Sequence, residues 1–120
     1  MIQQEFVDRL YTVGVKHVEI ALMKTYINPP GRKPSQRLKQ ISAWLNNLSS
    51  DDKAMIEAII SDAAEYSLFN TLSALDGVLP IYSIEENCSL ELWRKHGEVE
   101  TLINDSNAEY LHDLMPGKWQ

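Results

Sequence analysis

Residues 50–77, SDDKAMIEAIISDAAEYSLFNTLSALDG, decide the fold, because their apolar side chains repeat with a period of 3.6 rather than two. Ser49 or Ser50 can cap the start of a helix, and the two aspartates that follow lie where the helix dipole favours negative charge. Gly77 suits the left-handed position after a helix. The stretch therefore predicts one long central helix.

Two faces of this predicted helix are apolar. We call the first the isoleucine stripe; it consists of Ile56, Ile59, Ile60, Ala63, Ser67 and Ala74. The opposite face starts with acidic residues, Glu57, Asp62 and Glu65, and continues with Leu68, Leu72 and Leu75. A helix that is apolar on two sides is covered on both. We expect other helices to cover the isoleucine stripe and a later segment to cover the leucines.

Two further helices are predicted before the central one. Residues 2–26 have helical periodicity, and residues 35–48 have it again with Ser35 as the N-cap. Residues 27–34, INPPGRKP, form the loop between them, because three prolines and a glycine cannot lie in a helix interior. The connection from the second helix to the central helix is short, so we expect these two to be near-antiparallel neighbours.

After Gly77 the period changes towards two. Ile81, Tyr82 and Ile84 form a short strand candidate. Residues 89–95 and 98–103 predict a hairpin with His96-Gly97 as its two-residue loop. In this register Lys95 lies opposite Glu98, Arg94 opposite Val99 and Trp93 opposite Glu100.

A last short helix opens at residues 105–109, where Ser106 and Glu109 fit a capping box. The predicted fold is α+β and forms a single domain over residues 1–120. It has three main helices, a small antiparallel sheet packed on the third, and a short C-terminal helix. The alternative is an all-α bundle with an irregular C-terminal region.

Charge divides the chain unevenly. The net charge is −6, but residues 1–50 hold seven basic and three acidic side chains, whereas residues 51–120 hold four basic and fourteen acidic ones. The negative charge of residues 51–120 disfavours the binding of nucleic acid and favours a basic protein partner. No apolar run is long enough to span a membrane, no signal-peptide pattern opens the chain, and Cys88 is the single cysteine. We therefore expect a cytoplasmic protein.

No pattern of catalytic, metal-binding or nucleotide-binding residues is present. The three histidines, His17, His96 and His112, come without an HExxH pair, and one cysteine cannot form a CxxC site. Glu109 and His112 have the spacing of half a carboxylate-bridged metal site, but no matching pairs occur elsewhere. We expect no enzyme activity, no cofactor and no metal.

Two segments, NTLSALDGV at residues 70–78 and LINDSNAEYLHDL at residues 102–114, carry a resemblance. With the upstream segments GRKPSQRLKQISAWLNNLS and DDKAMIEAIISDAAEYSLF, they resemble a family of small bacterial proteins that has no assigned activity. Its members have a helix ending in LDGV and an LHDL-like C-terminal motif. The resemblance implies one compact domain and carries no catalytic residue or cofactor. Asn104 and Asp113 match it at positions where a structural role suffices.

The first functional hypothesis is therefore a protein-binding domain, specifically an immunity-type or antitoxin-like inhibitor of a basic protein. Its expected contacts are Trp93 as an aromatic anchor and the acidic residues Glu85, Glu86, Glu91, Glu98 and Glu100. The second is an enzyme or small-ligand binder that holds an anion at loop 31–39 with Arg32, Lys33, Arg37 and His17. The third is a homodimer built through a strand edge or Trp119, so the chain is expected to be a monomer or a homodimer.

Overall fold

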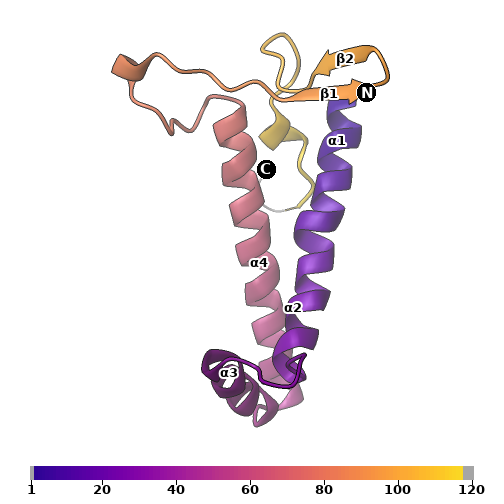
Figure 1. Cartoon of the computed structure of the whole chain (residues 1–120), viewed down its shortest axis with the longest axis vertical. Coiled ribbons are helices and arrows are strands. Elements are labelled where there is room, and N and C mark those ends of the chain that lie inside the picture. The colour runs from indigo at the N-terminus through magenta and orange to yellow at the C-terminus, as the bar shows by residue number, and fades with distance from the viewer. Residues whose placement is uncertain (1, 118–120) are drawn as a thin grey trace.

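Two long helical columns form the frame of the structure, a computed structural model that describes residues 2–117 (Figure 1). The first column comprises α1 (Ile2–Tyr11), a π-helical turn η1 (Thr12–Lys16) and α2 (His17–Ile27); α3 (Gln36–Asn46) follows, and α4 (Ser50–Leu75) returns as the second column. The remaining elements are the 3-10 turns η2 (Ile84–Glu86) and η3 (Leu111–Leu114) and the strands β1 (Trp93–His96) and β2 (Val99–Leu102). The α+β prediction is confirmed. Trp119 lies outside the described residues.

The first column is continuous, but its π-helical turn changes which residues are buried. A π turn holds more residues than an α turn, so the residues after it are rotated relative to those before it. Val7 and Val15, eight positions apart, are both buried, and so is Met23 eight positions further on. Val13 and His17, which a regular helix would place with the apolar face, are exposed. The predicted single helix is therefore correct in extent, and the strip that contains Val13 and His17 is exposed in its second half.

α3 closes the turn between the columns. The Ser35 hydroxyl accepts a hydrogen bond from Leu38 N at 3.2 Å, as expected of an N-cap. Asn46 Nδ2 donates to the Ile27 carbonyl at 2.9 Å, which satisfies an unpaired group at the end of α2. α3 packs mainly on α2 rather than as an antiparallel neighbour of α4, so that part of the prediction is wrong.

α4 begins and ends at the predicted signals. The Ser49 hydroxyl accepts a hydrogen bond from Asp52 N at 3.1 Å. At the other end Gly77 has a φ of 79°, and Val78 N donates to the Ser73 carbonyl at 3.1 Å. This pattern is a Schellman motif, in which a left-handed glycine satisfies the last carbonyls of a helix.

The core lies at the end of the columns where α1 begins and α4 ends. Its buried members are Val7, Leu72, Ile103, Leu111, Leu114 and Met115. The C-terminal segment passes between the two columns there (Figure 1), and Gln4 Nε2 holds it through the Leu114 carbonyl at 3.0 Å. A later segment thus covers Leu72, with Leu68 and Leu75 partly buried beside it, which confirms the expectation for that face.

The isoleucine stripe is covered only in part, because Ile56, Ile60 and Ala74 are half-buried while its other three residues are exposed, so the expectation that helices cover the whole stripe is wrong. Ile59 is 57% exposed, and Ala63 and Ser67 are exposed as well. The columns contact each other through the leucine side of α4, so α1 and α2 are not available to the other side. Glu65, expected to face solvent, is 9% exposed because Tyr11 packs over it and donates a hydrogen bond to it.

The hairpin has a different register from the predicted one. Observed partners are Trp93 with Leu102, Arg94 with Thr101, Lys95 with Glu100, and His96 with Val99. Gly97 and Glu98 therefore form the loop. Gly97 has a φ of 63° while Glu98 does not have a positive φ, which is the pattern of a type II′ turn with glycine first.

Two smaller predictions are also wrong. The strand candidate at residues 81–84 finds no partner and instead leads into η2, where a capping box joins Ser83 and Glu86. The expected C-terminal helix is the short 3-10 turn η3, without the capping box predicted for Ser106 and Glu109. η2 is held by its local capping box, and η3 is held by hydrogen bonds to Asp76, which is distant in the sequence. Neither segment depends on a hydrophobic period.

Candidate protein-binding surfaces

A hollow lies along the exposed side of α4. It has a volume of about 860 Å³ and is open to solvent. We call this surface the α4 face; the residues that define it are Ile59, Ala63, Ser67 and Ala74 on the helix and Leu79 and Ile81 beyond it. Its lining is mostly apolar, which is typical of a surface that docks a partner rather than of a solvated helix face.

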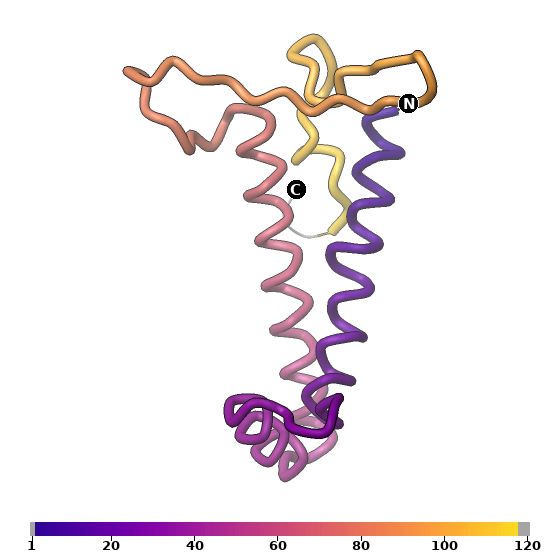
Figure 2. The backbone as a smooth tube through the Cα atoms, viewed as in Figure 1, coloured from indigo at the N-terminus to yellow at the C-terminus, as the bar shows by residue number. Residues whose placement is uncertain are grey.

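Residues 78–91 form an arm that leads away from the helices and returns to the hairpin. Figure 2 follows this path from the end of α4 outwards and back. The arm carries large apolar side chains that the chain itself does not cover, since Ile81 is 59% and Ile84 is 97% exposed. The tip is nevertheless ordered locally, because Ser83 N donates to Glu86 Oε2 at 2.8 Å. Exposed isoleucines on an ordered arm indicate a contact surface.

The structure divides the predicted acidic contact set between two places. Glu85 and Glu86 lie at the tip of the arm in η2, and the Glu86 carboxylate is already used as a cap. Glu98 and Glu100 lie on the hairpin with Trp93, which is 45% exposed, and all of β1 is exposed. Glu91 precedes β1 and is exposed.

One face of the hairpin combines aromatic and charged groups. Paired residues share a face, so Trp93 and Leu102 lie on the same side as Lys95 and Glu100. Lys95 Nζ and Glu100 Oε1 are 3.6 Å apart, and both side chains are more than half exposed. An ion pair this exposed contributes little to stability, so its groups are free to exchange partners.

The basic residues of the second hypothesis are not brought together with His17. Arg32 and Lys33 lie in the loop between α2 and α3, and Arg37 lies in the first turn of α3. His17 begins α2, and the eleven residues of that helix separate it from the loop by roughly 15 Å at 1.5 Å per residue. All four are exposed, and none of them lines the hollow described above.

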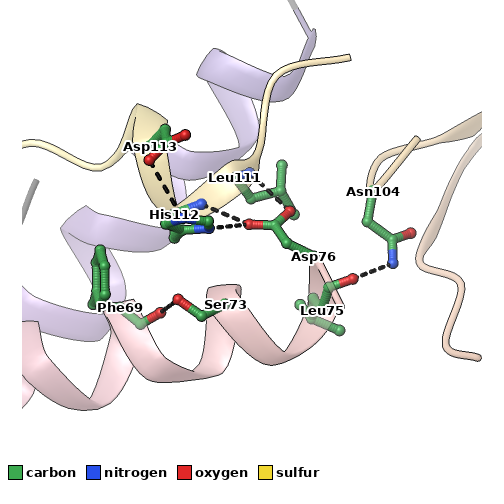
Figure 3. Close-up of polar contacts among 8 residues, drawn as sticks. All are labelled: Phe69, Ser73, Leu75, Asp76, Asn104, Leu111, His112 and Asp113. Carbon is green, nitrogen blue, oxygen red and sulfur yellow. Dashed lines mark hydrogen bonds and ion pairs between the residues drawn. The ribbon is translucent and has the colours of Figure 1, made fainter. Parts of the chain in front are cut away.

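A buried polar cluster joins the ends of the two segments that carry the family resemblance (Figure 3). Asp76 caps the end of α4 and accepts hydrogen bonds from Leu111 N at 2.8 Å and His112 N at 2.9 Å. His112 Nδ1 lies 2.6 Å from Asp76 Oδ2, and its Nε2 lies 3.3 Å from Asp113 Oδ1. The Asp76 side chain is only 3% exposed. The carboxylate therefore acts as the N-terminal cap of η3.

A second anchor lies beside this cluster. The Asn104 side chain donates to the carbonyls of Leu75 at 2.7 Å and Leu90 at 2.9 Å, and accepts from Leu92 N at 2.8 Å. These three bonds tie the end of α4 to both sides of the hairpin. Asn104 thus has the structural role that the sequence allowed for it.

The Asp76–His112 pair resembles the orienting half of a catalytic triad, but its surroundings differ from one. The outer nitrogen of His112 faces a carboxylate instead of a hydroxyl or thiol. Cys88 is exposed and lies on the arm. Within residues 2–117 no group of three or more His, Cys, Asp or Glu side chains is arranged to hold a metal ion.

One buried carboxylate lies between the columns. Tyr11 Oη donates a hydrogen bond of 2.5 Å to Glu65 Oε1. Burial, together with this bond and the negative charge of Glu65, raises the pKa of Tyr11 to about 12. The pair joins α1 to α4 and leaves the phenol protonated at neutral pH.

Three comparisons bear on the family of this chain. No protein-family model, no curated protein and no solved structure matches it. Across the part of the chain that the structure describes, no helix has the length and apolar character needed to cross a lipid bilayer.

The sequence indicated the hairpin surface but missed the α4 face and the arm. The apolar character of the isoleucine stripe is the sequence signal for the α4 face. The sequence does not show that the same chain leaves much of that stripe uncovered. The role of Asp76 as a cap for Leu111 had no local signal, because the two residues are separated by 35 positions.

Proposed function

We propose that the chain is a non-enzymatic protein-binding domain. The observation that carries the proposal is the hairpin, which projects from the end of the columns with every residue of β1 exposed. Trp93 is 45% exposed and lies on the same face as the Lys95–Glu100 ion pair. Tryptophan is among the residues that contribute most to protein interfaces when a partner buries them.

The proposed partner is a basic protein, and the proposed role is that of an immunity-type or antitoxin-like inhibitor. Glu91, Glu98 and Glu100 supply the negative rim around Trp93. Complementary charge accelerates association and excludes partners of the wrong sign. Glu85 and Glu86, at the tip of the arm, extend the same negative potential along the molecule.

The anchoring of the hairpin supports this proposal. Asn104 fixes both of its sides, and Ile103, directly after β2, is 1% exposed in the core. A platform that is ordered before binding loses little conformational entropy when the partner docks. The hairpin thus presents Trp93 and its neighbouring acids in one fixed arrangement.

A charge-reversal experiment tests the proposal. The double variant E98K/E100K should lose capture of a basic protein from the native lysate by at least tenfold, because its rim then repels the partner. The matched control is E57K/E109K, which changes the net charge by the same amount at exposed positions away from the hairpin. Equal capture by both double variants would refute the hairpin as the binding surface.

The family resemblance enters as a further part of the proposal. We propose that the LDGV and LHDL motifs mark a shared fold, because Asp76 of the first caps the turn that contains the second. In this interpretation the motifs maintain the platform, and the partner-binding residues lie outside them on the arm and hairpin.

A further inference from the structure

The chain exposes more surface than a compact protein of its mass. Its accessible surface is 8629 Å², whereas a folded monomer of 13.7 kDa is expected to expose about 6,600 Å². Its Cα radius of gyration is 18.4 Å, compared with about 14 Å for a compact domain of this length. The excess of about 2,000 Å² exceeds the roughly 800 Å² that one partner buries in a stable interface.

The α4 face accounts for part of this excess surface. Its arrangement of large and small side chains allows the same face of a second copy to fit against it. Two small residues, Ala63 and Ser67, lie at its middle beside the larger Tyr66. Ile59 lies towards one end and Ala74 towards the other, where Leu79 and Ile81 form the wall of the hollow. If two copies of α4 cross antiparallel about residues 66 and 67, Ile59 of each copy meets Ala74 of the other. A large side chain then enters the hollow where the partner helix has a small one.

We propose that the chain forms a two-fold symmetric, antiparallel homodimer through the α4 face and the arm. The dimer uses the α4 face and the arm but not the hairpin, so its molar mass is tested separately from capture of a basic protein by Glu98 and Glu100. The same patch is used by both copies, as a two-fold interface requires. Ile59 docks between Ala74 and the Leu79–Ile81 wall of the other copy, and the exposed isoleucines of the arm are covered.

Charge selects the antiparallel orientation. Residues 59–91, which hold most of the α4 face and the arm, contain no basic side chain and six acidic ones, of which all but the buried Glu65 and Asp76 can contribute to the surface. Residues 28–58, which contain α3 and the start of α4, hold five basic and three acidic ones. An antiparallel pair opposes these two regions, whereas a parallel pair would place the acidic regions against each other. A second copy therefore supplies the basic surface that the arm faces.

Measurement of the molar mass by light scattering and sedimentation tests the dimer. The full chain should have twice the 13.7 kDa mass of one copy at concentrations above about 1 µM. The variant Ile59→Glu should be monomeric with an unchanged helical circular dichroism spectrum, because Ile59 is 57% exposed in the single chain. The matched control is Ile20→Glu, which alters an isoleucine that is 69% exposed on α2 and should remain dimeric.

Disulfide trapping tests the orientation. Ala63→Cys and Asn70→Cys are made separately on a Cys88→Ser background, mixed under reducing conditions and then oxidised. The antiparallel dimer predicts a mixed disulfide between positions 63 and 70 in excess of either symmetric one. A monomeric wild-type chain, a dimer that survives Ile59→Glu, or an excess of symmetric disulfides would each overturn the proposal. If the monomer instead captures a different protein through Ile59, the α4 face docks that protein and the proposal is wrong.

Discussion

Asp76 and His112 lie 36 positions apart in the sequence, yet their side chains are 2.6 Å apart in the fold. The same carboxylate accepts the backbone N–H groups of Leu111 and His112. One residue thus lies at the end of α4 and holds the start of η3 with its side chain. The C-terminal segment and the core depend on this junction, because the segment that covers Leu72 passes directly through it.

Replacing Asp76 should therefore destabilise the whole domain. Asp76→Ala removes three hydrogen bonds to a carboxylate and leaves two backbone donors and an imidazole without their acceptor. We expect the free energy of unfolding in urea to fall by about 3 kcal/mol. Asp105→Ala is the control, because Asp105 accepts one local bond from Asn107 N, and it should cost about 1 kcal/mol or less. Similar losses in the two variants would contradict the role of Asp76.

Replacing Leu72 and replacing Ile84 by alanine should have very different effects on the free energy of unfolding. Leu72 is fully buried among residues of α1 and the C-terminal segment, so Leu72→Ala should lower the free energy of unfolding by about 2–5 kcal/mol. Ile84 is 97% exposed, and Ile84→Ala should change it by less than about 0.5 kcal/mol. These values are measured by urea denaturation at a concentration where the chain is monomeric. A large loss for Ile84 would show that the arm packs on its own chain.

The raised pKa of Tyr11 predicts that its contribution to stability is lost at alkaline pH. Burial and the hydrogen bond to Glu65 raise the pKa of Tyr11 from 10.0 to about 12, so folding favours the protonated phenol. Its contribution to stability is complete below pH 10 and disappears as the pH rises to about 12. The difference in the free energy of unfolding between wild type and Tyr11→Phe should therefore be constant at lower pH and shrink across this interval.

The control for Tyr11 is Tyr82→Phe, which alters an exposed phenol on the arm. At neutral pH Tyr82→Phe should change the free energy of unfolding by less than about 0.5 kcal/mol. At neutral pH Tyr11→Phe should cost about 1–3 kcal/mol, because Glu65 stays buried and loses its donor. A pH-independent difference for Tyr11→Phe would show that its phenol does not titrate differently on folding.

The sequence predicted the elements whose signals are local. Ser35 and Ser49 cap α3 and α4, and Gly77 takes the left-handed conformation after α4. Each of these residues acts within a few positions of itself, so its type and place are enough. The hairpin was also predicted, but Gly97 was placed second in its loop, and a type II′ turn requires glycine first.

The features that were missed depend on tertiary contacts. His17 is exposed after the π-helical turn at residues 12–16, and no single residue in that segment predicts a π turn. Periodicity showed that both sides of α4 are apolar, but it could not show that only the leucine side is covered by this chain. The division of the acidic set between arm and hairpin likewise follows from the path of the chain rather than from its composition.

The central claim is that the exposed acidic surface binds a basic protein, and the salt dependence of capture tests it most directly. The immobilised wild-type chain is incubated with the native lysate at low and at high salt, and the retained proteins are identified by mass spectrometry. We expect a basic protein to be retained at low salt and its retention to weaken at high salt, because salt screens exposed charges. Retention of no protein at either salt concentration, or only of an acidic protein insensitive to salt, would contradict the claim.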